Sequence, residues 1–160
     1  MLFIGIALML LCAFFAWREY TLYLGRELSE LAEFISFFKT MRERMKCYLE
    51  PPSAWIHNYS TPELLRVGFI GYIRDGADLC SAYTMCEGEL CISDEARAVI
   101  RDMLSAQGGG YLEGEISAID TAVDKLSLIE KRTREDHGNK SRAAGAVIAA
   151  VSIGVVILVI

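Results

Sequence analysis

The chain has 160 residues, of which 53% are hydrophobic and 23% are charged, and its formal net charge is −5. This length suits a single domain. The high hydrophobic content excludes a disordered chain, and an acidic balance without a basic stripe argues against nucleic acid as a partner. The sequence periods of collagen and of repeat solenoids do not occur, which leaves a small globular domain with unusual ends.

Both ends of the sequence lack charge. All 16 basic and 21 acidic residues lie between Arg18 and Arg142. As helices, residues 1–17 and 143–160 are each long enough to cross most of a hydrocarbon core of about 30 Å, where the backbone must satisfy its own hydrogen bonds. The first segment lacks the basic start and small-residue exit of a cleavable signal peptide. The sequence therefore predicts transmembrane helices at 1–17 and 143–160 around a domain at 18–142.

Basic residues flank both predicted spans on the side of the central domain. The residues concerned are Arg18 and Arg26 after the first span, and Lys131, Arg132, Arg134, Lys140 and Arg142 before the second. Because cytoplasmic flanks carry the excess of Lys and Arg, we expect the central domain to face the cytoplasm from the cell membrane.

The second predicted span carries a ridge of small residues. Ala146, Ala150 and Gly154 recur every four residues. Small residues at this spacing let helix backbones approach closely in lipid. We expect this ridge to pack against another span, from the same chain or from a neighbour, which leaves a homo-oligomer open.

Two stretches of the central domain show the apolar spacing of an amphipathic helix. One stripe comprises Leu24, Leu28, Leu31, Ile35, Phe38, Met45 and Leu49, and the other comprises Leu112, Ile116, Ile119, Val123 and Leu126. Steps of three and four residues place each set on one helix face, with Glu27, Glu30 and Glu33 away from the first stripe. Phe34, Phe37 and Met41 widen the first stripe, so we expect its helix to meet more than one partner helix.

Shorter helices are predicted between these two stretches. Pro51 and Pro52 end the first long helix, and Thr61 followed by Pro62 opens a helix over 61–73. Another is expected over 78–87. Ser93 begins one that runs to about 106 with Ala96, Val99, Ile100, Met103 and Leu104 inward, and three glycines at 108–110 end it. The sequence thus predicts an all-α protein, a small cytoplasmic helical bundle flanked by transmembrane helices.

Residues with catalytic or metal-binding chemistry form no recognisable motif. The glycines at 108–110 are followed by Tyr111, Leu112 and Glu113, and not by the Lys and Ser or Thr of a phosphate-binding loop. The five cysteines, at 12, 47, 80, 86 and 91, contain no CxxC pair. His57 lacks a nucleophile motif and is expected in an aromatic cluster with its neighbours. We expect a protein that is not an enzyme, with no metal and no cofactor.

The order of these elements resembles the stage III sporulation protein AB family over essentially the whole chain. The resemblance is carried by LGRELSELAEFISFFKTMRERM at 24–45, by ISDEARAVIRDML at 92–104, and by the run from Ile116 to Lys131 that leads into a hydrophobic tail. That family is similar to the helical platform proteins of type II secretion and type IV pilus machines.

The resemblance implies a non-catalytic part of the channel between mother cell and forespore in endospore formation. It would lie in the mother cell membrane beside other channel components and would dock a secretion-type ATPase, the stage III sporulation protein AA. Candidate docking residues on the short helices are Asp94, Glu95, Arg97 and Arg101, which could equally form a solvated face. Two alternatives stay open: a membrane-bound enzyme with an interfacial site around His57, and a generic helical membrane scaffold or receptor.

Overall fold

The computed structural model describes residues 2–49, 52–107 and 111–159. The side chains of residues 1–10, 13, 24, 50–53, 108–110, 140–142, 144–146 and 148–160 lie outside the described part. Throughout the three described ranges the regular structure is helical and includes no strand. The prediction of an all-α protein is confirmed.

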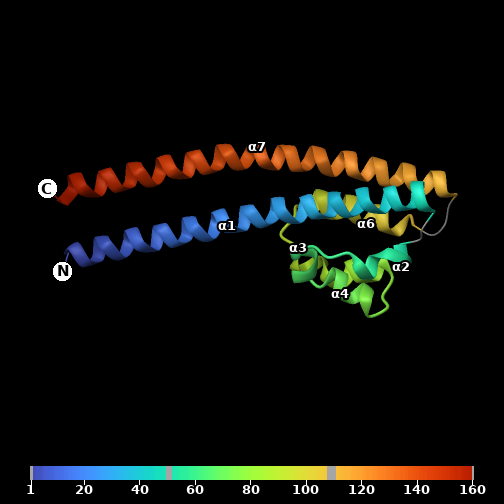
Figure 1. Cartoon of the computed structure of the whole chain (residues 1–160). Coiled ribbons are helices and arrows are strands. Elements are labelled where there is room, and N and C mark those ends of the chain that lie inside the picture. Colours follow the sequence, from blue (N-terminus) through green and yellow to red (C-terminus); the bar gives the residue numbers. More distant parts are fainter. Residues whose placement is uncertain (1, 50–51, 108–110, 160) are drawn as a thin grey trace. The chain divides into compact units, whose positions relative to one another are not determined.

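In sequence, two long helices come before and after a series of short ones (Figure 1). The long helices are α1 (Leu2–Glu43) and α7 (Leu112–Val159). The short elements, in order, are η1 (Arg44–Tyr48), α2 (Pro52–Trp55), η2 (Ile56–Asn58), α3 (Pro62–Arg66), α4 (Phe69–Arg74), α5 (Leu79–Cys86), η3 (Glu87–Glu89) and α6 (Asp94–Ser105). Residues 26–131 form one compact unit, and residues 1–25 with 132–160 form a second.

Most of the predicted transmembrane side chains lie outside the described part of the protein, and so do those of Ala146, Ala150 and Gly154. In the described part of the chain, no helix has an apolar stretch long enough to cross a bilayer.

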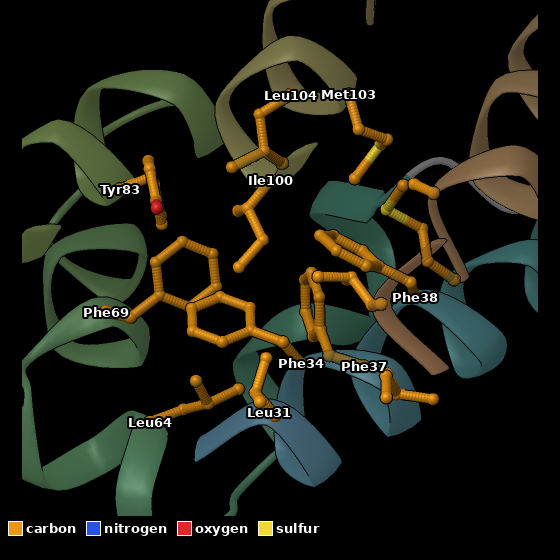
Figure 2. Packing of buried hydrophobic residues seen from close by; sticks show 14 of the residues in the cluster. Leu31, Phe34, Phe37, Phe38, Leu64, Phe69, Tyr83, Ile100, Met103 and Leu104 are labelled. Atoms are coloured by element: carbon orange, nitrogen blue, oxygen red, sulfur yellow. The ribbon is translucent and has the colours of Figure 1, made fainter. Parts of the chain in front are cut away.

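The apolar face of α1 forms the centre of the core of residues 26–131. Leu31, Phe34, Phe37 and Phe38 are fully buried, and Figure 2 shows them pointing toward residues of α3, α4, α5 and α6. The ring centroid of Phe34 lies 5.6 Å from that of Phe69 and 6.0 Å from that of Tyr83. Aromatic pairs at such separations add about 0.5–1.5 kcal/mol beyond the burial of their area. The expectation that the widened face meets several helices is confirmed.

The first long helix ends in a wide turn. After Glu43 the chain forms the π-helical η1, and Leu49 then adopts φ 54°, in the left-handed region. Met45 is buried as predicted, but the prediction that Leu49 continues the apolar stripe is wrong, because its side chain is 73% exposed. A π-helical turn holds more residues than an α-helical one, so it rotates the following side chains away from the core face.

The single helix expected over 61–73 is two helices. α3 and α4 are separated at Gly68, which has φ +85° and so adopts a conformation that other residues rarely tolerate. The turn changes the direction of the chain between α3 and α4. The side chains of Leu64, Phe69, Ile70 and Ile73 are all buried. The expected start is correct, since α3 begins at Pro62, although the side chain of Thr61 makes no capping hydrogen bond.

The remaining helices follow their predicted boundaries closely. Asp78 accepts a hydrogen bond from Ser81 N at the start of α5, and Ser93 accepts one from Ala96 N at the start of α6. In α6 the inward residues are correctly predicted, with Val99 half-buried and the others buried. The glycines at 108–110, expected to end α6, lie outside the described residues.

The second long helix packs through the middle of its predicted stripe. Ile119, Val123 and Leu126 are buried, and Arg42 Nε on α1 lies 2.5 Å from Asp120 Oδ1 on α7. At the beginning of α7 the prediction fails, since Leu112 is 40% exposed and Ile116 is only half-buried. A stripe marks which face of a helix can be buried, but the partner elements determine how far along it the burial extends.

Candidate docking surface

The four predicted docking residues lie on α6: Asp94, Glu95 and Arg101 are exposed, and Arg97 lies half-buried beside the face that enters the core. The Ser93 cap starts the helix, and its first turn carries Asp94 and Glu95, where carboxylates suit the positive end of the helix dipole. The Asp94 side chain is fully exposed and Glu95 is also exposed. Both acids are therefore presented to solvent by a helix whose opposite side is fixed in the core.

The two arginines are held by contacts within the protein. Arg97 donates a hydrogen bond to the Leu90 carbonyl at 2.6 Å, and its side chain is 28% exposed. Arg101 pairs with Glu87 of η3. These contacts tie α6 to the segment that precedes it. The four candidates thus comprise two outward acids and two arginines with contacts inside the protein, and Arg97 Nη1 also lies 3.7 Å from Asp94 Oδ1.

A shallow groove runs between α5, η3 and α6. It is lined by Thr84, Glu87, Gly88, Asp94, Arg97 and Arg101, so it contains three of the four candidate residues. Charged groups of both signs at an open groove can bind a charged protein surface. The buried Tyr83 contacts the backbone of one groove residue, since its hydroxyl donates a hydrogen bond to the Arg97 carbonyl at 3.3 Å. Burial raises the pKa of Tyr83.

One carboxylate that was predicted to face solvent is buried and contacts the segment just before α6. Glu30 is 0% exposed, so the prediction that it faces away from the core is wrong. Its Oε2 accepts a hydrogen bond from Cys91 N at 2.6 Å, and its Oε1 pairs with Arg66. Burial raises the pKa of Glu30, while the bond from Cys91 and the charge of Arg66 act in the opposite direction.

A second acid of α1 caps one of the short helices. Glu33 Oε2 accepts hydrogen bonds from Glu63 N and Leu64 N, both at 2.9 Å, which satisfies two donors in the first turn of α3. Glu33 is half-buried and so is also closer to the core than predicted. Sequence reasoning assigned this capping role to Thr61, because a cap supplied from thirty residues away leaves no local pattern.

The proposed catalytic alternative centres on an exposed side chain. His57 lies on η2 at the surface, while Trp55 is 6% exposed and Tyr59 is half-buried. The ring centroids of Trp55 and Tyr59 are 5.7 Å apart, and the ring of Phe37 packs against both. The expected aromatic cluster is present, with His57 outside it.

Cysteines and acids show no arrangement suited to a metal ion within the described ranges, where no group of three or more His, Cys, Asp or Glu residues converges. The five cysteines are free: Cys12 and Cys47 are exposed, Cys80 and Cys91 are half-buried, and Cys86 is buried. Burial raises the pKa of Cys86 to about 12, which keeps this thiol protonated and unreactive at neutral pH.

Comparisons of the chain with protein-family models, with curated proteins and with solved structures return no match.

Proposed function

We propose that this chain is a non-catalytic membrane platform of the channel between mother cell and forespore, and that it docks a secretion-type ATPase from the cytoplasmic side. The proposal extends the resemblance to the stage III sporulation protein AB family. Residues 1–17 and 143–160 would anchor the chain in the mother cell membrane, with Ala146, Ala150 and Gly154 packing against another span.

The observation that carries the proposal is the course of the two long helices. α1 begins in one uncharged end of the sequence and supplies the centre of the core, and α7 leaves that core and continues to the other uncharged end. The same helices thus belong both to the folded domain and to the segments proposed as anchors.

The acids of α6 support the proposed docking. Asp94 and Glu95 are exposed, whereas Arg97 and Arg101 hold the helix in place. Residues 26–131 contain 18 acidic and 11 basic residues, so the domain favours a partner with a basic surface. An ATPase that binds here would need Lys or Arg residues at its contact face.

The test is cross-linking of the tagged full-length chain in sporulating cells, followed by identification of the attached proteins. We expect a secretion-type ATPase to be recovered from wild type and to be depleted by Asp94→Asn with Glu95→Gln. The matched control is Asp124→Asn with Glu113→Gln, two exposed acids of α7 outside the groove, which should leave recovery unchanged.

Two results would overturn the proposal. Normal spore formation in a strain that lacks the gene would remove the channel role. Digestion of the central domain by protease added outside intact cells would reverse the proposed topology, and docking to a cytoplasmic ATPase would then be impossible.

A further inference from the structure

A second concave site lies on residues 26–131, away from the groove of α6 that carries Asp94. It has a volume of ≈ 540 Å³, within the range of natural ligand sites. Its walls include Ile56, Ile73 and Leu104, which come from η2, α4 and α6 and are 1%, 7% and 2% exposed. The interior of the cavity is therefore apolar and is built by elements distant in sequence.

The charged side chains that line this cavity are all acidic. Asp78 and Glu115 line it, and no Lys or Arg does so among the described residues. Asp78 is exposed, and its Oδ2 accepts a hydrogen bond from Ser81 N at 3.1 Å, which holds the carboxylate at the start of α5. An apolar interior with acids at its edge is complementary to an apolar surface that carries positive charge.

The distribution of polar groups favours a protein segment over a small molecule. A small-molecule site usually has polar groups that converge inside the pocket to orient the ligand. Here the fully buried lining side chains are apolar, and the polar ones are the exposed Asp78 and Ser105 and the half-buried Gln107 and Glu115. An apolar centre with a polar rim is the anatomy of a protein interface, and helices commonly dock in such grooves through residues spaced by three and four.

We propose that this cavity is a docking site for a basic amphipathic helix of a partner protein. Leucine-like side chains of that helix enter between Ile56, Ile73 and Leu104. Its Lys or Arg residues face Asp78 and Glu115 at the edge. The proposal depends on the cavity alone, so it stands or falls independently of the ATPase and of the sporulation role.

Binding is measured with the purified full-length chain in zwitterionic nanodiscs, with empty nanodiscs as background. The probes are two synthetic helical peptides with the same leucine face, one with lysines and one with glutamates on the opposite face. We expect the lysine peptide alone to bind and to slow alkylation of Cys80, which lines the cavity. Cys91, which is also half-buried but does not line it, is the internal reference.

Variants distinguish docking in the cavity from general attraction to an acidic domain. Asp78→Asn keeps a side chain that can cap α5. Combined with Glu115→Gln, it should weaken the lysine peptide about three- to tenfold, the effect of losing one ion pair at the exposed Asp78 and one at the half-buried Glu115. The matched pair Asp75→Asn with Glu113→Gln neutralises neighbouring exposed acids outside the cavity and should change affinity less than twofold, a few tenths of a kcal/mol.

A bulky residue at the mouth gives a test that does not depend on charge. Ser105→Trp, at an exposed lining position, should reduce binding by at least about tenfold, whereas Ser117→Trp, exposed on α7 outside the cavity, should not. Equal binding of the two peptides, or no protection of Cys80, would overturn the proposal. Protection of Cys80 by the lipophilic cation tetraphenylphosphonium without protection by the peptide would also overturn it, in favour of a small-molecule site.

Discussion

Replacing Glu30 with alanine tests whether a buried carboxylate joins three parts of the domain. Glu30 belongs to α1, its Oε1 pairs with Arg66 of α3, and its Oε2 accepts the Cys91 N–H just before α6. Alanine removes both contacts at a position with 0% exposure. The change therefore leaves a backbone donor without its acceptor and removes one buried methylene group.

The expected loss of unfolding free energy is about 2 kcal/mol. An unsatisfied buried N–H costs about 1–3 kcal/mol, and each buried methylene contributes about 0.8 kcal/mol. Breaking a fully buried ion pair would cost about 3–5 kcal/mol. The lower figure applies because Arg66 is 41% exposed and keeps its contact with Glu63 Oε2 at 2.7 Å, so its charge is not left buried and unpaired. Removing a negative charge that is costly to bury offsets part of this loss of unfolding free energy.

Denaturant unfolding of the full chain in mild nonionic detergent measures this loss. Fluorescence of Trp55, which is 6% exposed in the core, reports the transition in a Trp17→Phe background. Glu43→Ala, an exposed acid of the same helix, should change stability by less than about 0.5 kcal/mol. A Glu30→Ala protein as stable as this control would refute the view that the buried carboxylate links the domain.

The pH dependence of the same unfolding gives a second check on Glu30. Because burial raises its pKa above the ordinary value of 4.5, the folded state binds the proton more tightly than the unfolded state does. Wild type should therefore lose stability relative to Glu30→Gln as pH rises from about 4.5 through the folded-state pKa. The stability difference should be larger in favour of wild type at pH ~5 than at pH ~7.5, and the opposite trend would contradict the assigned cause.

Further variants test the core, the turns and the thiols. Phe37→Ala should cost about 3–5 kcal/mol in denaturant unfolding, since the fully buried ring contacts Phe38, Trp55, Tyr59 and Phe69. Leu49→Gly should raise stability by up to about 1 kcal/mol because it relieves the left-handed backbone of an exposed residue, and Leu49→Val should lower it. Gly68→Ala should cost about 1 kcal/mol or more, because its φ is +85° and the new Cβ would lie 3.1 Å from the Tyr72 ring. Alkylation followed by peptide mapping should modify Cys47 in the folded protein and Cys86 only on unfolding, since burial raises the Cys86 pKa to about 12.

Local patterns predicted the parts of the fold that depend on neighbouring residues. The start of α6 after Ser93 and the start of α3 at Pro62 follow from residues that favour helix N-termini, and the buried middle of each stripe follows from three- and four-residue spacings. The break at Gly68 was missed, because an isolated glycine inside an apolar run is compatible with either a continuous helix or a turn. The outward acids of α6 were predictable in the same way, whereas the contacts of Arg97 and Arg101 were not.

The sequence does contain a signal for the burial of Glu30, although this residue was predicted to face away from the first apolar stripe. Phe34, Phe37 and Met41 widen the face of α1, and Glu30 precedes Phe34 by four residues, so it begins the same row. Extending the row by one turn toward the N-terminus would have placed this acid at the core edge. Its partners Arg66 and Cys91, 36 and 61 residues away, could not be identified without the fold.

The two acids of α1 help to explain how the very short helix α3 persists in this domain. α3 has 5 residues, far below the length at which a helix is stable alone. Glu33 supplies the missing acceptor at the start of α3, and Glu30 holds both Arg66 of that helix and the Cys91 backbone two residues before the Ser93 cap of α6. The acids that we propose for docking follow this cap directly. The position of the proposed docking face therefore depends on α1, both through the core that its aromatic side chains share with α6 and through the hydrogen bond from Cys91 N to Glu30 just before α6.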